Sequence, residues 1–320
     1  MGFDDHLAAR RAPLPPLHLL GREVQGVVSW NVNDTCNYRC SYCTQRFMPD
    51  RTFRLEEIEP WLAAFGKLPG CWEIKLSGGE PFQQPGLTEI TAGLVERGHI
   101  LSIQTNFSAS ERKLEAFLDA TRGALHVFAA SLHLEVDTPE AFAERYALLR
   151  PFIAEHGLSF CVTSVAVPER LQHLRDHVAP FFAERGITFK VQPEKVHGVV
   201  RPYTAQERAL LMELGGHNRT GEIEPNYRGR MCWAGARYLV IKSSGEAFRC
   251  YPASRIGGRN ARLGSFVEGI ELLEGPTLCP YTHCNCTVPI HRGMIEGIRP
   301  VGGDGAEEEI EDVYPLPARP

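Results

Sequence analysis

Between residues 23 and 193 the sequence alternates apolar, strand-like segments with segments of helical periodicity. Strands are predicted at residues 24–33, 72–77, 100–105, 126–133, 158–167 and 187–193, with a helical segment between consecutive strands and a short three-cysteine loop after the first. Such alternation predicts an α/β fold with a parallel sheet and right-handed crossovers. Eight units would close a TIM barrel, so six predict an open or partial (β/α)6 TIM-like barrel. Chemistry in such sheets lies at the carboxyl ends of the strands.

The pattern changes on both sides of this region. We expect an irregular N-terminal arm over residues 1–22, the barrel over 23–200, a small cysteine-rich domain over 201–300 and an acidic, disordered tail over 301–320. Within the small domain, residues 204–215 are a candidate helix. Residues 236–253 predict a hairpin that turns at Ser244 and Gly245.

Composition narrows the class of protein. The formal net charge of -5 makes general nucleic-acid binding unexpected. The sequence contains no run of about 18 apolar residues and no apolar signal core at its start, so we expect no membrane association and a cytoplasmic location. In a reducing compartment, the 10 cysteines indicate metal ligands or catalytic groups rather than disulfides.

Three cysteines fall within ten residues, in the stretch "DTCNYRCSYC" that follows the first predicted strand. Cys36, Cys40 and Cys43 could share one face of a helix as buried core residues, but the polar residues between them favour an exposed loop. A zinc site would need a fourth ligand from elsewhere. A [4Fe–4S] cluster takes four thiolates, so three would leave one iron open to bind a small molecule.

The spacing Cys-x3-Cys-x-aromatic-Cys, with Tyr42 as the aromatic residue, resembles the signature of radical S-adenosylmethionine (radical SAM) enzymes. The resemblance implies a partial (β/α)6 barrel with this motif after its first strand. It also implies a cofactor pair, a [4Fe–4S] cluster and S-adenosylmethionine bound at the open iron. Reductive cleavage of S-adenosylmethionine would give a 5′-deoxyadenosyl radical that abstracts a hydrogen atom from the substrate.

A second motif strengthens the resemblance. "LSGGEPF" follows the second strand, and Gly78-Gly79-Glu80-Pro81 resembles the family's GGEP motif, which holds the methionine amino group. Glycines permit close approach of the backbone, and the Glu80 carboxylate can pair with an ammonium. Further strand-end residues match family contacts to S-adenosylmethionine more loosely: Thr105, Asn106, Ser131, Ser164, Val191 and Gln192.

Five more cysteines follow residue 231. The arrangement Cys232-x12-Gly245-x4-Cys250 resembles the SPASM and twitch extensions of the same family, which bind auxiliary iron–sulfur clusters, although a zinc site or spare thiols remain alternatives. The low number of cysteines favours a twitch-type domain with one auxiliary [4Fe–4S] cluster. We expect Cys284 and Cys286 to complete its ligands. Cys279 would then be either a hydrogen-atom donor to substrate or a small buried hydrophobe.

Other polar residues gather near the fourth and sixth strands. His133, Lys190 and Glu194 are candidates to orient substrate or to move a proton, as are Glu135 and His197. The alternative for each is an ordinary hydrogen-bonded residue at a strand end.

The resemblance therefore predicts a radical SAM enzyme that oxidises or epimerises a small molecule such as a sugar or aminocyclitol. It would need an external electron donor such as a flavodoxin or ferredoxin. The short N-terminal arm argues against a leader-binding domain, but a peptide- or protein-modifying enzyme (a maturase) remains an alternative. A non-catalytic iron–sulfur or zinc scaffold is a second alternative, which the GGEP motif disfavours because a scaffold needs no methionine-binding corner.

Overall fold

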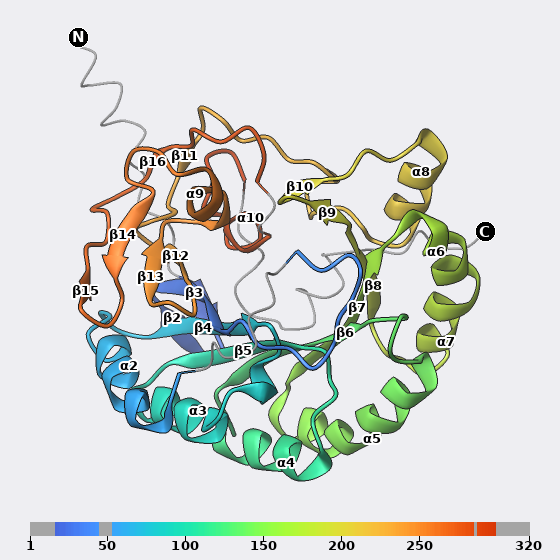
Figure 1. Cartoon of the computed structure of the whole chain (residues 1–320), viewed down its shortest axis with the longest axis horizontal. Coiled ribbons are helices and arrows are strands. Elements are labelled where there is room, and N and C mark those ends of the chain that lie inside the picture. Colours follow the sequence, from blue (N-terminus) through green and yellow to red (C-terminus); the bar gives the residue numbers. More distant parts are fainter. Residues whose placement is uncertain (1–16, 45–52, 285–286, 299–320) are drawn as a thin grey trace.

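A sheet of 10 strands forms the centre of the computed structural model, which describes residues 17–44, 53–284 and 287–298 (Figure 1). The strand order is β15-β14-β13-β12-β3-β4-β5-β6-β7-β8, and the segment from β3 to β8 is parallel throughout. The bounds of these parallel strands are β3 (Gly26–Asn33), β4 (Trp72–Gly78), β5 (Ile100–Thr105), β6 (Leu125–Leu132), β7 (Ser159–Ala166) and β8 (Phe189–Pro193). The six strands predicted from the sequence and the α/β class are confirmed.

Helices cover the convex side of this curved sheet, as Figure 1 shows for α2 to α7. They are α2 (Ile58–Phe65), α3 (Leu87–Glu96), α4 (Glu111–Ala120), α5 (Pro139–His156), α6 (Pro168–His173) and α7 (Ala179–Ala183). Two short 3-10 turns, Leu55–Glu57 and Pro81–Gln83, precede α2 and α3. The helix predicted over 168–186 is interrupted by a π-helical turn, Leu174–Val178, between α6 and α7. No described helix is both long and apolar enough to cross a membrane.

The C-terminal third joins the same sheet. β12 (Tyr238–Ile241) pairs in parallel with β3, and β13 (Glu246–Phe248), β14 (Arg262–Ser265) and β15 (Gly269–Ile270) continue it antiparallel. The predicted hairpin is confirmed, but it extends the sheet instead of belonging to a separately folded unit. The short elements around it are β9 (Lys195–Val196), β10 (Val199–Val200), α8 (Ala205–Glu213), β11 (Met231–Cys232), α9 (Tyr251–Ile256), β16 (Thr277–Leu278) and α10 (Val288–His291).

The N-terminal arm is only partly as expected. β1 (Leu17–Leu19) and β2 (Arg22–Val24) form an antiparallel hairpin, so the prediction of irregular structure is wrong for residues 17–22. Leu17 and Leu19 face inward and are buried, because alternate residues of a strand point to the same side. The rest of the arm and the predicted disordered tail, residues 301–320, lie outside the described residues.

The two faces of the parallel sheet differ in chemistry. On β3, Val28, Trp30 and Val32 face the helices, and Trp30 stacks on Trp61 of α2 at 4.9 Å between ring centroids. The residues between them, Ser29 and Asn31, face the concave side. The same alternation continues across β4 to β8, so the helix-facing side holds the apolar core and the concave side, here called the inner face, is polar.

A buried carboxylate is bonded to several groups on the inner face. Glu73 of β4 is fully buried and lies 3.1 Å from Lys75 Nζ, 3.0 Å from Arg292 Nη2 and 3.4 Å from His126 Nδ1, while Ser102 donates a 2.7 Å hydrogen bond. Burial opposes ionisation, yet the neighbouring positive charges hold the pKa of Glu73 well below its ordinary value. Because Arg292 follows α10, this network ties the C-terminal segment to the sheet.

We predict that Glu73→Gln destabilises the protein by about 3–5 kcal/mol at pH 7, because it leaves buried cations without their carboxylate. The stabilisation by Glu73 is present above the carboxyl's ordinary pKa of 4.5 and is lost as the pH falls below it. The wild-type free energy of unfolding, measured in urea, should therefore fall more steeply below pH 4.5 than that of the variant. Glu59→Gln, which alters an exposed pair with Arg97, is the matched control and should cost less than about 1 kcal/mol. Equal pH dependence in Glu73→Gln and wild type would contradict the assignment.

Candidate active site

The three-cysteine loop begins at the carboxyl end of β3, at the edge of the sheet where the loops after β4, β5 and β6 also lie. Each of these neighbouring strand ends holds the loop through different groups. The predicted position of Cys36, Cys40 and Cys43, after the first parallel strand, is confirmed.

The GGEP corner contacts the loop through its backbone. The Gly79 and Glu80 amides donate to the carbonyls of Asn33 and Thr35 at 3.0 and 2.7 Å. A Cβ atom on Gly79 would lie 2.1 Å from the Thr35 carbonyl oxygen, and one on Gly78, whose φ is +144°, would lie 2.5 Å from that of Asn33. Both positions therefore require glycine, and the close approach that glycine permits is made to the cysteine loop.

Glu80 connects β4 to β5. Its carboxylate is fully buried and accepts hydrogen bonds from Thr105 Oγ1 at 2.7 Å, from the Asn106 amide at 2.7 Å and from the Phe82 amide at 3.0 Å. Burial raises the pKa of Glu80, against the effect of these donors. Pro81 starts the short 3-10 turn that places the Phe82 amide. Pairing of Glu80 with an ammonium stays a prediction.

Two N–H groups point at the sulfur of Cys36. The Tyr38 amide lies 3.3 Å from Sγ, and Asn106 Nδ2 lies 3.9 Å from it while also donating to Asn37 Oδ1 at 2.8 Å. Asn37 in turn donates to Ser108 Oγ at 2.9 Å. N–H groups near a ligating sulfur stabilise the thiolate and tune the potential of an attached cluster, so Asn106 acts on the site from the end of β5.

The residues after β6 hold the other end of the loop. Tyr42 Oη lies 2.9 Å from His133 Nδ1, and the amide and hydroxyl of Ser41 donate to Glu135 at 2.8 and 2.5 Å. Burial lowers the pKa of His133. From the sequence, His133 and Glu135 were candidates to orient substrate or to move a proton. The structure shows that they hold the cysteine loop in place through Tyr42 and Ser41. No local pattern signals these contacts, because the partners are about 90 residues apart.

Burial acts on two of the three thiols. Burial raises the pKa of Cys36, and it raises that of Cys40 to about 11. Among the described residues no three His, Cys, Asp or Glu side chains already converge as a metal ion would require. A cubane cluster has its ligated irons at separate corners, so its thiolates need not converge on one point. The loop carries three thiols near one another, which fits a cluster with one iron left open.

The remaining predicted cofactor contacts divide between the two faces of the sheet. Ser131 lies on the inner face with Gln104, whose amide donates to its hydroxyl at 3.3 Å, and the alternation along β8 places Gln192 there too. Ser164 and Val191 are paired on the opposite, helix-facing side, where Ser164 donates to the Leu132 carbonyl and Val191 packs in the apolar core. Strand alternation turns both side chains away from the inner face, and contact of these two residues with S-adenosylmethionine stays a prediction.

Two of the predicted catalytic residues, Lys190 and Glu194, lie in different surroundings. Lys190 is half-buried on the inner face and pairs in register with Thr163. Glu194 lies beyond the strand, where its carboxylate accepts a 2.8 Å hydrogen bond from Arg201 and its amide faces the Tyr203 hydroxyl. Proton transfer by either group stays a prediction.

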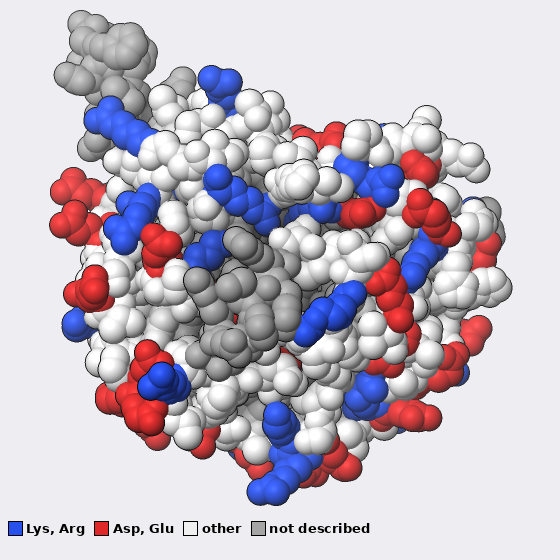
Figure 2. Space-filling view, viewed as in Figure 1, with Lys and Arg blue, Asp and Glu red and all other residues white. Residues whose placement is uncertain are grey.

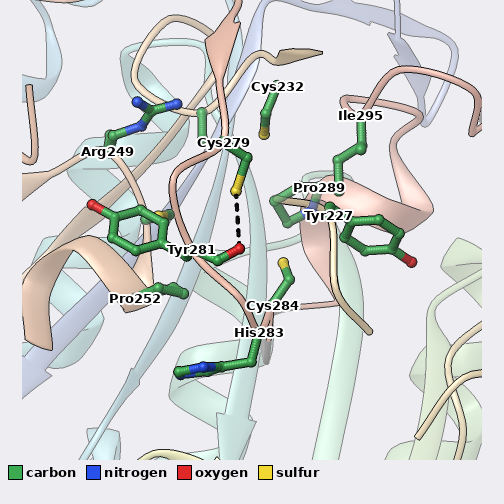
Figure 3. Close-up of a pocket in the computed structure, with 12 residues that line it drawn as sticks. Tyr227, Cys232, Arg249, Pro252, Cys279, Tyr281, His283, Cys284, Pro289 and Ile295 are labelled. Carbon is green, nitrogen blue, oxygen red and sulfur yellow. Dashed lines mark hydrogen bonds between the residues drawn. The ribbon is translucent and has the colours of Figure 1, made fainter. Parts of the chain in front are cut away.

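A second group of thiols lines one cavity beside α9 and α10. Cys232 ends β11, Cys250 precedes α9, Cys279 follows β16 and Cys284 lies further along the same loop. Figure 3 shows the sulfur atoms of Cys232, Cys279 and Cys284 pointing toward one another, with Tyr281 and His283 at the side. The cavity is small, about 20 Å3, so a cluster would have to push the side chains apart.

Cys279, which we expected to be left over from the ligand set, lies in this cavity with the other cysteines. Antiparallel pairing of β11 with β16 sets Cys232 opposite Thr277, and this brings Cys279 into the cavity, where its thiol faces the Tyr281 carbonyl at 3.9 Å. Cys286, the ligand we had preferred, lies outside the described residues. Cys71 precedes β4 and Cys161 lies within β7, and neither lines this cavity.

A parallel α/β sheet with a three-thiol loop at its carboxyl edge defines a class of protein that presents several thiols above a polar inner face. The comparisons with known proteins indicate a family for one segment of the chain. Residues 30–156 match the model of the radical SAM superfamily, and this segment contains the cysteine loop, the GGEP corner and the ends of β4 to β6. Over these residues the chain resembles the radical SAM superfamily.

Curated relatives match about a third of the chain. The chain is 34% identical over 111 residues to GTP 3′,8-cyclase 2 of Pseudomonas aeruginosa, with 33% of each chain covered. It is 30% identical over 119 residues to GTP 3′,8-cyclase of Listeria monocytogenes, with 35% of each covered. The chain thus matches about a third of the length of these relatives.

Solved structures share the fold over more of the chain. The similarity to His6-tagged anSMEcpe with bound AdoMet covers 76% of this chain and 78% of that one, with a TM-score of 0.54 and 14% identity. The similarity to Streptococcus suis SuiB bound to S-adenosylmethionine covers 76% and 64%, with a TM-score of 0.51 and 16% identity. At such identities the likeness establishes the fold alone.

We predict that Gly79→Ala detaches the cysteine loop from the GGEP corner, because its Cβ would lie within 2.1 Å of the Thr35 backbone. The cost is about 3 kcal/mol of folding free energy, and the iron bound after anaerobic reconstitution should fall. Gly275→Ala is the control, since nothing lies within 4 Å of a Cβ there, and it should change stability by less than about 0.5 kcal/mol. Wild-type stability and iron content in Gly79→Ala would show that the close approach is unimportant.

Proposed function

We propose that this protein is an enzyme that binds a [4Fe–4S] cluster through Cys36, Cys40 and Cys43 and S-adenosylmethionine at the open iron. The observation that carries the proposal is the clamping of a three-thiol loop to the GGEP corner, at the carboxyl edge of the sheet and within the segment that matches the family. When bound and reduced by an external donor such as a flavodoxin or ferredoxin, the cluster supplies the electron that cleaves S-adenosylmethionine to a 5′-deoxyadenosyl radical.

Side chains and amides of this chain hold the site in place. Tyr38 and Asn106 direct N–H groups at the Cys36 sulfur, which favours the thiolate form. Glu80, hydrogen-bonded to both β4 and β5 ends, fixes the corner that would receive the methionine amino group. The inner face below, with Gln104 and Ser131 near the site, would receive the substrate.

We infer a small-molecule substrate that loses a hydrogen atom to the radical. Oxidation or epimerisation of a sugar or aminocyclitol is the outcome suggested by the twitch-like cysteines. A ring-forming rearrangement is the second candidate, favoured by relatives named GTP 3′,8-cyclase, although the match covers only about a third of this chain. Product mass separates oxidation, which removes two hydrogens, from epimerisation and rearrangement, which remove none. The NMR spectrum of the product distinguishes an epimer from a product with a new ring.

The test of the proposal is release of 5′-deoxyadenosine from S-adenosylmethionine under anaerobic, reducing conditions. Mutation of a group that only supports a metal ligand lowers metal affinity or activity by about 10–100-fold. Loss of a ligand itself should cost more, so Cys36→Ala, Cys40→Ala or Cys43→Ala should lower this release at least about 100-fold. Cys161→Ala, at a thiol within β7, is the matched control and should leave it unchanged. Purified protein that holds zinc alone and releases no 5′-deoxyadenosine would refute the proposal.

We propose further that Cys232, Cys250, Cys279 and Cys284 hold one auxiliary [4Fe–4S] cluster. These four cysteines line one cavity, which supports this set of ligands. Cys279 then has the role of ligand that the sequence had suggested for Cys286. The reconstituted chain should then carry about eight irons, which is two four-iron clusters.

Cys279→Ala distinguishes the two ligand sets. If Cys279 is a ligand, the variant should lose about half of the iron while the loop at Cys36 still supports some cleavage of S-adenosylmethionine. Cys286→Ala should retain the full iron content. The reverse pattern, measured by iron analysis and visible absorption, would make Cys279 the spare thiol.

A further inference from the structure

Two lysines project from the inner face on strands that lie far apart in the sheet order. Lys75 is on β4, two residues after Glu73, and Lys190 is on β8. Lys190 pairs with Thr163, which pairs with Ser131, so it shares the inner face with these residues. Burial lowers the pKa of Lys190 and the positive charge of Lys75 lowers it further, so the two ammonium groups act on each other across the curved sheet.

Two arginines approach the same place from the C-terminal part of the chain. Arg292 directly follows α10 and lies 3.0 Å from the Glu73 carboxylate, which is itself 3.1 Å from Lys75. Arg219, in the loop after α8, donates to the His291 carbonyl at 3.5 Å. Figure 1 shows α10 on the inner side of the sheet, opposite the layer formed by α2 to α7.

The electrostatics of His291 indicate the sign of the potential there. Burial lowers the pKa of this imidazole to about 3, and every charged group that adds to the effect is a cation: Lys190, Arg292, Lys75 and Arg219. Burial also lowers the pKa of His126, against the effect of the neighbouring Glu73 carboxylate. Figure 2 shows Lys and Arg side chains around the middle of this face of the molecule, whereas Asp and Glu lie mostly toward its edge.

The inner face is accessible beside these cations. Gln104, in the middle of the sheet on β5, is exposed, and Ser131 and Gln192 are half-exposed. The Lys75 side chain is 27% exposed. A sheet interior that served only as core would bury these positions, so a molecule entering from the carboxyl edge can reach the cations from the S-adenosylmethionine site.

We propose that Lys75, Lys190, Arg219 and Arg292, here called the inner cation cluster, bind an oxyanion group of the substrate, a phosphate or a carboxylate. The inference rests on the proposed function and adds the substrate class, an anionic small molecule. Four cations from four separate elements match a group with several acceptor oxygens, and the guanidinium groups can bind it bidentately. Binding at the cluster would hold the neutral part of the substrate toward Ser131 and the open iron.

The experiment is isothermal titration calorimetry of the reconstituted full chain with inorganic phosphate and with succinate, each against sodium chloride at matched ionic strength. Both anions should bind where chloride does not, and the tighter of the two identifies the source of the oxyanion. Lys190→Gln should weaken the preferred anion about 10-fold, the loss of one charge-assisted hydrogen bond, whereas Lys190→Arg should retain most of the affinity. Lys67→Gln, an exposed lysine after α2, is the matched control and should bind as wild type does.

Lys75→Gln provides the same test if Lys190→Gln fails to fold. Wild-type protein that binds neither anion more tightly than chloride would overturn the inference, as would unchanged affinity in both lysine variants. The assay needs no turnover, so its failure is separable from failure of the proposed function. Release of 5′-deoxyadenosine without anion binding would leave the radical SAM assignment intact and remove only the substrate class.

Discussion

The close approach of two backbone segments, at Thr35 and Gly79, is the constraint on which the candidate site depends. Only a residue without Cβ can bring the end of β4 within hydrogen-bonding distance of the loop that carries the three thiols. Glu80 follows directly and is drawn into the end of β5, where Thr105 and Asn106 bond it. The Asn106 side chain then donates toward the Cys36 sulfur. Contacts from the ends of β3, β4 and β5 therefore hold the loop in place.

The contrast between the two faces of the sheet explains how one fold supplies both stability and a site. Apolar side chains such as Trp30 and Phe128 pack against the helices, where burial stabilises the fold. Their neighbours in sequence point to the inner face and are free to be polar. Buried charge on that face is tolerated because Glu73 lies among cations and a serine hydroxyl, and the same network attaches the segment after α10.

The sequence was informative where the signal is local. Apolar periodicity predicted β3 to β8 and the helices between them, and the cysteine spacing with the GGEP motif predicted the loop and its corner. Non-local pairing was not predictable in this way. Nothing in the segment around Tyr238 indicates that it pairs in parallel with β3, and nothing near Cys279 indicates that β16 pairs with β11. Period-two alternation along β7 was itself readable, and it assigns Ser164 to the side of Phe160 and Val162, away from the inner face.

The central claim is that the cluster at Cys36, Cys40 and Cys43 has an iron to which S-adenosylmethionine binds. Electron paramagnetic resonance of the reduced, reconstituted chain tests it most directly, in a Cys232→Ala/Cys250→Ala background that leaves this cluster alone. The account predicts that adding S-adenosylmethionine changes the g-values of the reduced cluster. A spectrum that S-adenosylmethionine leaves unaltered would mean that no iron is open to it and would contradict the account.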